Sequence, residues 1–279
     1  MVSLISQSPK GNQPKWADSD YFYKQDNFPG ESLAEYICSL FLESSNCDIP
    51  FLTYRLTQPY VTKSPSYKPR FTMLPFERLV AIYLTETGYK SNLRTYKEGV
   101  INYWYKQFWM RHSVAERLKF VLTVFSYFGV SEDESLKYLT YMVELDTLVL
   151  NIDRHFNNFG LMYDYKEKRY KPMFLFDNGL SLCVGEGQLG SLKDMTDLRK
   201  VKMQPFSSRL SSNRNVLPPF KFPFDVVRFV DLVKDSFPFG LEYLKSSTQY
   251  IVFKHRLRVE YVKDCNGVDI LDYLTKVGL

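Results

Sequence analysis

Residues 145–179 read LDTLVLNIDRHFNNFGLMYDYKEKRYKPMFLFDNG, and the order of patterns within this stretch decides the fold. An apolar stretch with helical spacing ends where the polar, loop-like segment 151–160 begins. Residues 161–163 and 171–176 then form two short apolar runs around a charged turn, which predicts a β-hairpin. The hairpin ends abruptly at residues 177–179, Asp-Asn-Gly. The stretch therefore predicts a helix, a polar loop and a hairpin that carry acidic and amide side chains at fixed positions.

Three side chains in this stretch have the spacing that phosphoryl transfer requires. Asp153 precedes Asn158 by five positions, and Asp177 follows after the hairpin. Protein kinases use this spacing to place one carboxylate beside the acceptor hydroxyl and two oxygen ligands on Mg²⁺. An isolated Asp-Asn-Gly is a common turn, and Asp-x4-Asn alone also fits a solvated loop. Their order, with a helix before and a hairpin between, favours a catalytic loop and a metal ligand.

The segment NIDRHFNNFGLMYD…KPMFLFDNGLSL resembles the HipA-like kinases, including stand-alone members of the cell-translocating type. The resemblance implies that Asp153 is the catalytic base and that His155 orders the loop or contacts the transition state. It also implies that Asn158 and Asp177 bind magnesium. The Asp-Arg-His-x-x-Asn order is similar to phosphoinositide-kinase loops as well, which places the chain in the wider kinase-like fold.

The segment YFYKQDNFPGESLAEYICSLFLESS, residues 21–45, resembles the strand and helix that precede the catalytic loop in these kinases. By this resemblance Lys24 contacts the α- and β-phosphates of ATP, and Glu35 pairs with Lys24. Glu31 lies one turn earlier on the same helix face and is an alternative partner.

By the same resemblance, RFTMLPFERL, residues 70–79, would be the last small-lobe strand and the hinge. The backbone at Met73 and Leu74 is therefore expected to bind the adenine edge.

The N-terminal region departs from the HipA-like pattern in two respects. It has no GxGxxG motif, and the loop at Ser6–Gln13 has a single glycine with which to cover phosphates. The residues before Lys24 are also too few for the additional N-terminal subdomain of the antitoxin-paired HipA toxins. We therefore expect no direct association with DNA, and an antitoxin partner stays open but has no support in the sequence.

Composition sets the broad class of the protein. The 279 residues carry a mild net charge of +5 that is spread over 36 basic and 31 acidic side chains, unlike the concentrated basic stripe of a nucleic-acid binder. Four scattered cysteines and three histidines do not form a zinc motif. With no leader pattern, and with an apolar run at 120–130 that is too short to span a bilayer, we expect a cytoplasmic protein without a membrane partner.

The predicted architecture is an α+β, two-lobe, protein-kinase-like fold. Residues 1–75 are expected to form a small β-rich lobe, and residues 76–279 a larger helical lobe. In the small lobe a strand at 21–24 precedes a helix opened by Pro29-Gly30, and further strands are expected at 49–56 and 70–74. Residues 58–69 are expected to form a loop.

The helical lobe is predicted from caps and periodicity. Ser113-Val-Ala-Glu116 and Ser131-Glu-Asp-Glu134 are capping-box patterns, each followed by an apolar-periodic segment. Closing helices are expected near 224–235, 241–263 and 267–277.

These patterns predict an enzyme that transfers the γ-phosphoryl group of ATP, with Mg²⁺, to a Ser or Thr hydroxyl of a protein substrate. A lipid or small-molecule kinase is the alternative within enzymes. A kinase-like binding module of weak activity is the alternative outside them, because the phosphate-covering loop is unlike the usual motif.

Overall fold

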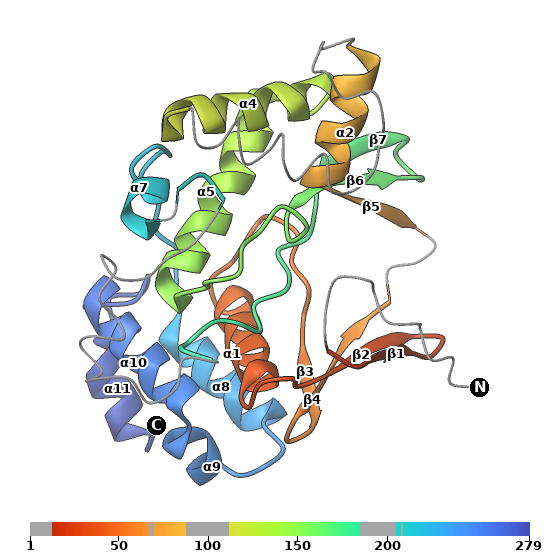
Figure 1. Cartoon of the computed structure of the whole chain (residues 1–279). Helices are drawn as coiled ribbons and strands as arrows, with labels where there is room; N and C mark the ends of the chain where they lie inside the picture. Colours follow the sequence, from red (N-terminus) through yellow and green to blue (C-terminus); the bar gives the residue numbers. More distant parts are fainter. Residues whose placement is uncertain (1–12, 67–69, 88–111, 185–204, 208) are drawn as a thin grey trace.

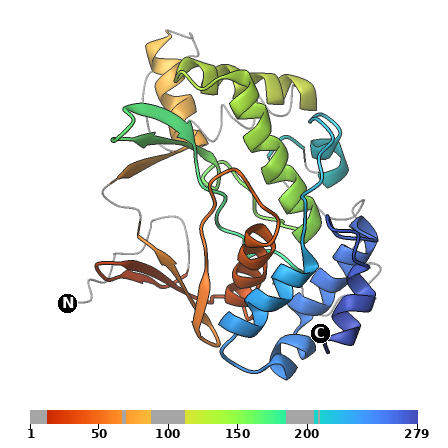
Figure 2. The ribbon, with the colours of Figure 1, turned by 180° about the vertical axis from the view of Figure 1, so that it is seen from behind.

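The computed structural model of this chain describes residues 13–66, 70–87, 112–184, 205–207 and 209–279. Within these residues the fold is mixed α+β, with two small antiparallel sheets and a set of helices. The two sheets lie on one side of the molecule, and helices α5, α8 and α10 lie on the other (Figures 1 and 2).

The first sheet has the strand order β1-β2-β4-β3. Its strands are β1 (Lys15–Ala17), β2 (Tyr21–Gln25), β3 (Arg55–Gln58) and β4 (Val61–Pro65). The predicted strand that carries Lys24 is confirmed as β2, and it lies inside the sheet between β1 and β4.

The chain between the first helix and β4 differs from the prediction. Residues 49–56 do not form one strand, because the strand begins only at Arg55, and Phe51 makes an isolated parallel bridge to Leu175. Residues 61–65, expected to be loop, form β4. The Thr, Ser and Pro content of this segment masked a strand whose alternate residues are buried, because β4 pairs on both sides.

The second sheet has the order β5-β6-β7, formed by β5 (Phe71–Pro75), β6 (Gly160–Asp164) and β7 (Arg169–Pro172). The predicted hairpin is confirmed as β6 and β7, but its second strand ends at Pro172, and of residues 173–176 only Leu175 makes an isolated bridge. By contrast, β5 was expected to join the N-terminal strands and instead pairs with β6. A Cβ atom on Gly160 would lie 2.3 Å from the Leu74 carbonyl oxygen, so only glycine permits this close pairing.

The helices account for most of the remaining described residues. They are α1 (Glu31–Glu43), α2 (Phe76–Glu86), α4 (Val114–Tyr127), α5 (Glu132–Val149), α7 (Leu210–Arg214), α8 (Val226–Ser236), α9 (Leu241–Ser246), α10 (Thr248–Glu260) and α11 (Ile270–Lys276). None of the helices in the described part of the chain is both long and apolar enough to cross a bilayer.

The predicted caps set several helix boundaries. Ser113 and Glu116 form a reciprocal capping box at α4, and the Ser131 hydroxyl accepts from the backbone of Glu134 at α5. The helix expected at 241–263 is two helices, because Ser247 is extended and its hydroxyl caps α10.

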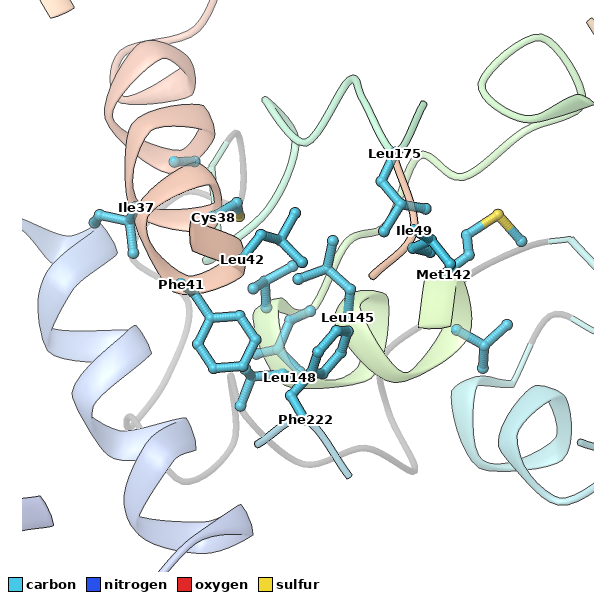
Figure 3. Packing of buried hydrophobic residues seen from close by; sticks show 14 of the residues in the cluster. Ile37, Cys38, Phe41, Leu42, Ile49, Met142, Leu145, Leu148, Leu175 and Phe222 are labelled. Carbon is cyan, nitrogen blue, oxygen red and sulfur yellow. The ribbon is translucent and has the colours of Figure 1, made fainter. Parts of the chain in front are cut away.

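Helix α1 lies at the centre of the molecule and positions the site (Figure 1). Residues 31–42 are all buried, because α1 contacts β3 and β4 on one side and α8 and α10 on the other. Figure 3 shows Phe41 and Leu42 of α1 turned toward Leu145 and Leu148 of α5. Gly30 begins the helix at φ 98, where a Cβ atom would lie 2.6 Å from the Gln249 side chain.

Candidate active site

Asparagine side chains order the loop that follows α5. The helix ends at Leu150 in the left-handed conformation, with φ 56. The Asn151 Oδ1 atom then accepts from the Asp153 backbone N–H at 3.0 Å, and the Asn158 Nδ2 atom donates to the Asp153 carbonyl oxygen at 2.9 Å. Both amides are buried, so they define the loop conformation and leave the Asp153 side chain half exposed.

Asp153 has the environment of a carboxylate that can accept a proton. Burial raises its pKa, and the nearby Asp177 and Glu31 carboxylates raise it further, while His155 opposes the shift. Asp153 and Asp177, the two predicted acidic residues, are thus close enough to influence each other's charge, and they belong to the same site. A raised pKa moves a carboxylate toward the range that general bases use.

His155 is oriented by the loop itself. Its Nδ1 atom accepts from the Asn157 backbone N–H at 3.1 Å, so the proton of the neutral ring lies on Nε2. The Nε2 atom is 3.8 Å from Asp153 Oδ2. The ring therefore presents a donor toward Asp153 without forming a short hydrogen bond to it.

Arg154 is the structural centre of the loop, which the sequence did not indicate. Its fully buried guanidinium lies 2.8 Å from Asp146 of α5, and Nη1 donates to the carbonyl oxygens of Asn158 and Phe176 at 3.0 and 2.7 Å. A further bond at 2.8 Å reaches Asn178 Oδ1. One side chain thus holds the backbone at Asn158 and the backbone that leads into Asp177. The signal available in the sequence was an acidic residue, Asp146, between the apolar residues Leu145 and Leu148.

Lys24 joins the N-terminal sheet to the segment after the hairpin. Its Nζ atom lies 2.6 Å from Glu35 Oε1 and 2.8 Å from Asp177 Oδ1. The other Glu35 oxygen accepts from the Thr62 hydroxyl at 3.1 Å. The side chains of Lys24, Glu35 and Asp177 are 16%, 1% and 29% exposed, so Asp177 is the member that faces solvent most.

The charges in this cluster depend on burial and pairing. Burial lowers the pKa of Lys24, but Asp177 and Glu35 together raise it well above its ordinary value. Burial raises the pKa of Glu35 despite the lysine beside it. Burial also acts to raise the pKa of Asp177, but the Lys24 ammonium outweighs this and lowers it to about 2. Asp177 is therefore ionised throughout the physiological range.

Glu31, the alternative partner of Lys24, has a different role. It is buried at the start of α1 and accepts from the backbone N–H groups of Asn27 and Phe28 and from the Gln13 side chain. These bonds close the turn before the helix, where unpaired N–H groups favour a carboxylate. Glu35 is thus the residue that contacts Lys24.

A second lysine lies beside this cluster and was missed in the sequence. Lys15 of β1 is the register partner of Lys24 on β2, and its charge contributes to the low pKa of Asp177. Residues opposite one another on paired strands share a face of the sheet. Lys15 can be assigned to the site only from the pairing of β1 with β2, which local sequence does not reveal.

Met73 and Leu74, the two expected hinge residues, lie on β5 opposite Met162 and Leu161. In an antiparallel ladder the N–H and C=O groups of every second residue point toward the partner strand. The Phe76 N–H donates to the Phe159 carbonyl, so the N–H and C=O of Leu74, two residues earlier, also point toward β6. The Met73 backbone then faces the open edge of the sheet. Of the two residues, only Met73 therefore has backbone groups that could contact a ligand at that edge.

A cavity of about 490 Å³ lies beside this strand. It is lined by residues near both sheets: Pro50, Ser66, Arg70, Phe71, Met162, Lys171 and Phe174. Phe174 is three residues before Asp177, a distance of at most about 10 Å along an extended chain. The cavity and the charged cluster are therefore close enough for one elongated ligand to contact both.

The donor set at Asn158 and Asp177 fits magnesium. Both offer hard oxygen atoms, and Asn158 uses its Nδ2 in the loop, which leaves Oδ1 as the atom that could face a metal. No cluster of three or more His, Cys, Asp or Glu side chains in the described residues could hold a metal alone. Mg²⁺ in phosphoryl-transfer sites needs no such cage, because one or two protein oxygens act together with substrate phosphates.

A comparison with solved structures shows the fold of this chain. The chain is similar to a Helicobacter pylori proinflammatory kinase, CtkA, with a TM-score of 0.54 and 13% sequence identity over 93% of each chain. The sequence matches no protein-family model and no curated protein sequence. At this identity the similarity shows a kinase-like fold, and the roles of individual residues depend on the geometry of the site.

Proposed function

We propose that this protein is an ATP- and Mg²⁺-dependent kinase that transfers the γ-phosphoryl group to a Ser or Thr hydroxyl of a protein. The observation that carries the proposal is the contact of Lys24 with both Glu35 and Asp177, beside the loop that holds Asp153. An ammonium, two metal-binding oxygens and a base in one kinase-like fold are the parts that phosphoryl transfer uses.

Lys24 and Glu35 prepare the site for the triphosphate. The buried Glu35 carboxylate holds the Lys24 ammonium at 2.6 Å, so the flexible lysine chain is already ordered. The ammonium remains charged and can donate to the α- and β-phosphate oxygens. Lys15, on the adjacent strand, adds a second positive charge on the same face.

Asp153 accepts the proton of the attacking hydroxyl. Its half-exposed carboxylate is open to an acceptor that arrives from solvent, which suits a side chain on another protein. His155 presents its Nε2–H on the side of Asp153, where it could contact the transition state. The resemblance of this loop to HipA-like kinases supports Ser and Thr as the acceptors.

Asn158 and Asp177 would hold the metal ion. When bound, Mg²⁺ neutralises the charge that develops on the β- and γ-phosphates. The low pKa of Asp177 keeps its carboxylate charged for this purpose. The adenine base would lie in the cavity beside β5, which is lined by Phe71 and by Met162, the register partner of Met73.

Labelled ATP tests this proposal directly. The purified protein is incubated with γ-labelled ATP and Mg²⁺, alone and with a generic protein, a phosphoinositide or small alcohols as acceptors. We expect transfer to Ser and Thr of the protein acceptor, and loss of transfer in chelator. Label only on lipid or small alcohols would identify the alternative kinase class, and nucleotide binding without transfer would identify a binding module.

A pair of lysine variants controls for nonspecific effects. Lys24→Met removes the phosphate contact and should abolish most transfer. Lys63→Met changes a lysine of the same sheet whose ammonium lies over the Tyr21 ring, 4.6 Å from its centre, and should retain activity. Equal activity of the two variants would contradict the assignment of Lys24.

A further inference from the structure

The cavity beside β5 has an apolar part and a charged part. Phe71 and Phe174 form an aromatic wall, with their ring centres 5.5 Å apart, and Met162 of β6 adds a thioether. Side chains of this kind pack well against a flat, uncharged ring. The charged part consists of Arg70, which directly precedes β5, and Lys171 of β7. The cavity therefore offers apolar walls for a base and cationic donors that can select which base binds.

Asp164 of β6 holds both cations in place. Its Oδ2 atom accepts from Arg70 Nη2 and from Lys171 Nζ, each at 3.2 Å. Its Oδ1 atom accepts from the backbone N–H groups of Lys166 and Glu167 at 2.9 and 3.2 Å. These four bonds fill the lone pairs of a carboxylate that is 0% exposed, so Asp164 offers no acceptor to a ligand. The cations are thus ordered by an acid that does not itself face the cavity.

The charges at this end of the cavity balance, which argues against a phosphate as the bound group. Glu167 also pairs with Lys171, so two cations face two carboxylates. Each cation still has N–H groups beyond those that bond the acids, because an ammonium has three and a guanidinium five. Among the described residues that line the cavity, Ser66 has the only side-chain acceptor. A neutral set that consists mainly of donors suits uncharged acceptors such as ring nitrogens and carbonyl oxygens.

Purine bases differ at the edge that such donors would contact. Guanine presents two adjacent acceptors, O6 and N7, which lysine and arginine recognise in nucleic acids. Adenine presents N7 beside its N6 amino group, which is itself a donor and gains nothing from a cation. The donors at the cavity therefore match the guanine edge better than the adenine edge.

We propose that Arg70 and Lys171 recognise the O6/N7 edge of a 6-oxopurine, so that GTP serves as the phosphoryl donor at least as well as ATP. The inference rests on the proposed function and specifies its nucleotide. The transfer itself is unchanged. The bond between the γ-phosphorus and the β–γ bridging oxygen breaks, the acceptor oxygen bonds to phosphorus, the hydroxyl proton passes to Asp153, and GDP leaves.

Calorimetric titration with ADP, GDP and IDP, each with Mg²⁺, tests the proposal independently of turnover. IDP keeps O6 and N7 but lacks the 2-amino group of GDP, so it isolates the edge that the cations would contact. We expect GDP and IDP to bind wild-type protein at least as tightly as ADP, and up to about tenfold more tightly. Weaker binding of both than of ADP overturns the proposal, as does a gain for GDP that IDP does not share.

Lys171→Met and Arg70→Met separate the contributions of the two cations. Lys171 is 18% exposed and Arg70 is 50% exposed, so a bond from the lysine is better shielded from water. Lys171→Met should weaken GDP and IDP binding about five- to twentyfold, and Arg70→Met about two- to fivefold. ADP binding should change by about twofold or less in both variants. The kinetic counterpart is a higher KM for GTP at a nearly unchanged KM for ATP.

Arg169→Met is the matched control. Arg169 lies on the same hairpin, but it pairs with Glu134 and Glu167 and is not part of the cavity wall. Its substitution should leave the ratio of GDP to ADP affinity unchanged. If Lys171→Met does not fold, the half-exposed Arg70→Met gives the test, and an unchanged ratio overturns the proposal. Wild-type protein that binds none of the three nucleotides and transfers no label would instead overturn the proposed function.

Discussion

Two ionic clusters lie close together in this molecule and differ in how they use their charges. The open cluster consists of Lys24, Glu35 and Asp177, and its ammonium and one carboxylate retain contact with solvent. The closed cluster consists of Asp146 and Arg154, both of them 0% exposed. In the closed cluster the guanidinium directs its bonds to protein acceptors, whereas in the open cluster Asp177 has an oxygen accessible to a ligand.

The pKa shifts of the two clusters reflect this difference. Burial raises the pKa of Asp146 in spite of its bidentate arginine partner, because complete removal from water outweighs the attraction. Asp177 is also paired with a cation, but its pKa falls to about 2 because Lys24 outweighs its partial burial. The ion pair of the closed cluster thus holds the loop in place, whereas that of the open cluster keeps a charged carboxylate accessible to a ligand. Four experiments test this contrast.

The largest expected effect is on catalysis beside the open cluster. Asp153→Asn should lower phosphoryl transfer by about 10²–10⁴-fold, because the proton acceptor is lost. Stability should be unchanged or slightly higher, since burial and neighbouring carboxylates raise the pKa of Asp153 and its charge is unfavourable. Initial rates and thermal melts measure the two effects, with the exposed Asp235→Asn of α8 as control. Near-full activity would identify a different base.

The closed cluster should respond through stability. Arg154→Met leaves a buried carboxylate at Asp146 and removes the donor for two carbonyl groups, at a cost of about 3–5 kcal/mol in the free energy of unfolding. Urea denaturation measures this cost, and Arg258→Met on the exposed face of α10 is the control. The double variant Asp146→Leu/Arg154→Met should recover part of the loss. If Arg154→Met lowers the free energy of unfolding no more than Arg258→Met does, the two clusters do not differ in the way described.

Acid titration of the open cluster should give a smaller effect. The folded-state pKa of Asp177, about 2, is below the unfolded value of 3.8. Its pairing therefore stabilises the fold above about pH 4, and this contribution is lost as the pH falls toward 2. The contribution is at most about 2 kcal/mol. The stability difference between wild type and Asp177→Asn, measured by urea unfolding, should shrink over that range; a difference independent of pH would mean that Asp177 is not paired in solution.

The smallest expected effect is at Glu35. Glu35→Gln keeps one oxygen to accept from Lys24, places an NH2 group beside the Thr62 hydroxyl, and removes the charge of a carboxylate whose pKa burial already raises. With Asp177 still holding the ammonium, kcat/KM should fall by about five- to tenfold. Glu43→Gln on the same helix, where Glu43 pairs with Arg55, is the matched control. Should the two variants lose equal activity, the loss would reflect helix α1 rather than the position of Lys24.

Local sequence determined the elements that carry the site. The helix from Glu31, the capped helices from Val114 and Glu132, and the hairpin of β6 and β7 each have a period, a cap or a turn within a few residues. Such signals come from residues three or four positions apart, so they can be recognised in the sequence without knowledge of the fold. The residues expected at the site also follow from short motifs, and their catalytic roles remain predictions.

Tertiary structure alone decided which elements meet. Lys24 and Asp177 are 153 positions apart and lie 2.8 Å from each other, and β5 pairs with a strand almost ninety residues later rather than with its N-terminal neighbours. The acidic residue at 146 could be read from the sequence, but its burial against Arg154 and the bond from Arg154 to the Asn158 backbone could not. Contacts of this kind are set by the packing of α1 between a sheet and the C-terminal helices. That packing depends on the shapes of many buried side chains together, and no short stretch of sequence contains it.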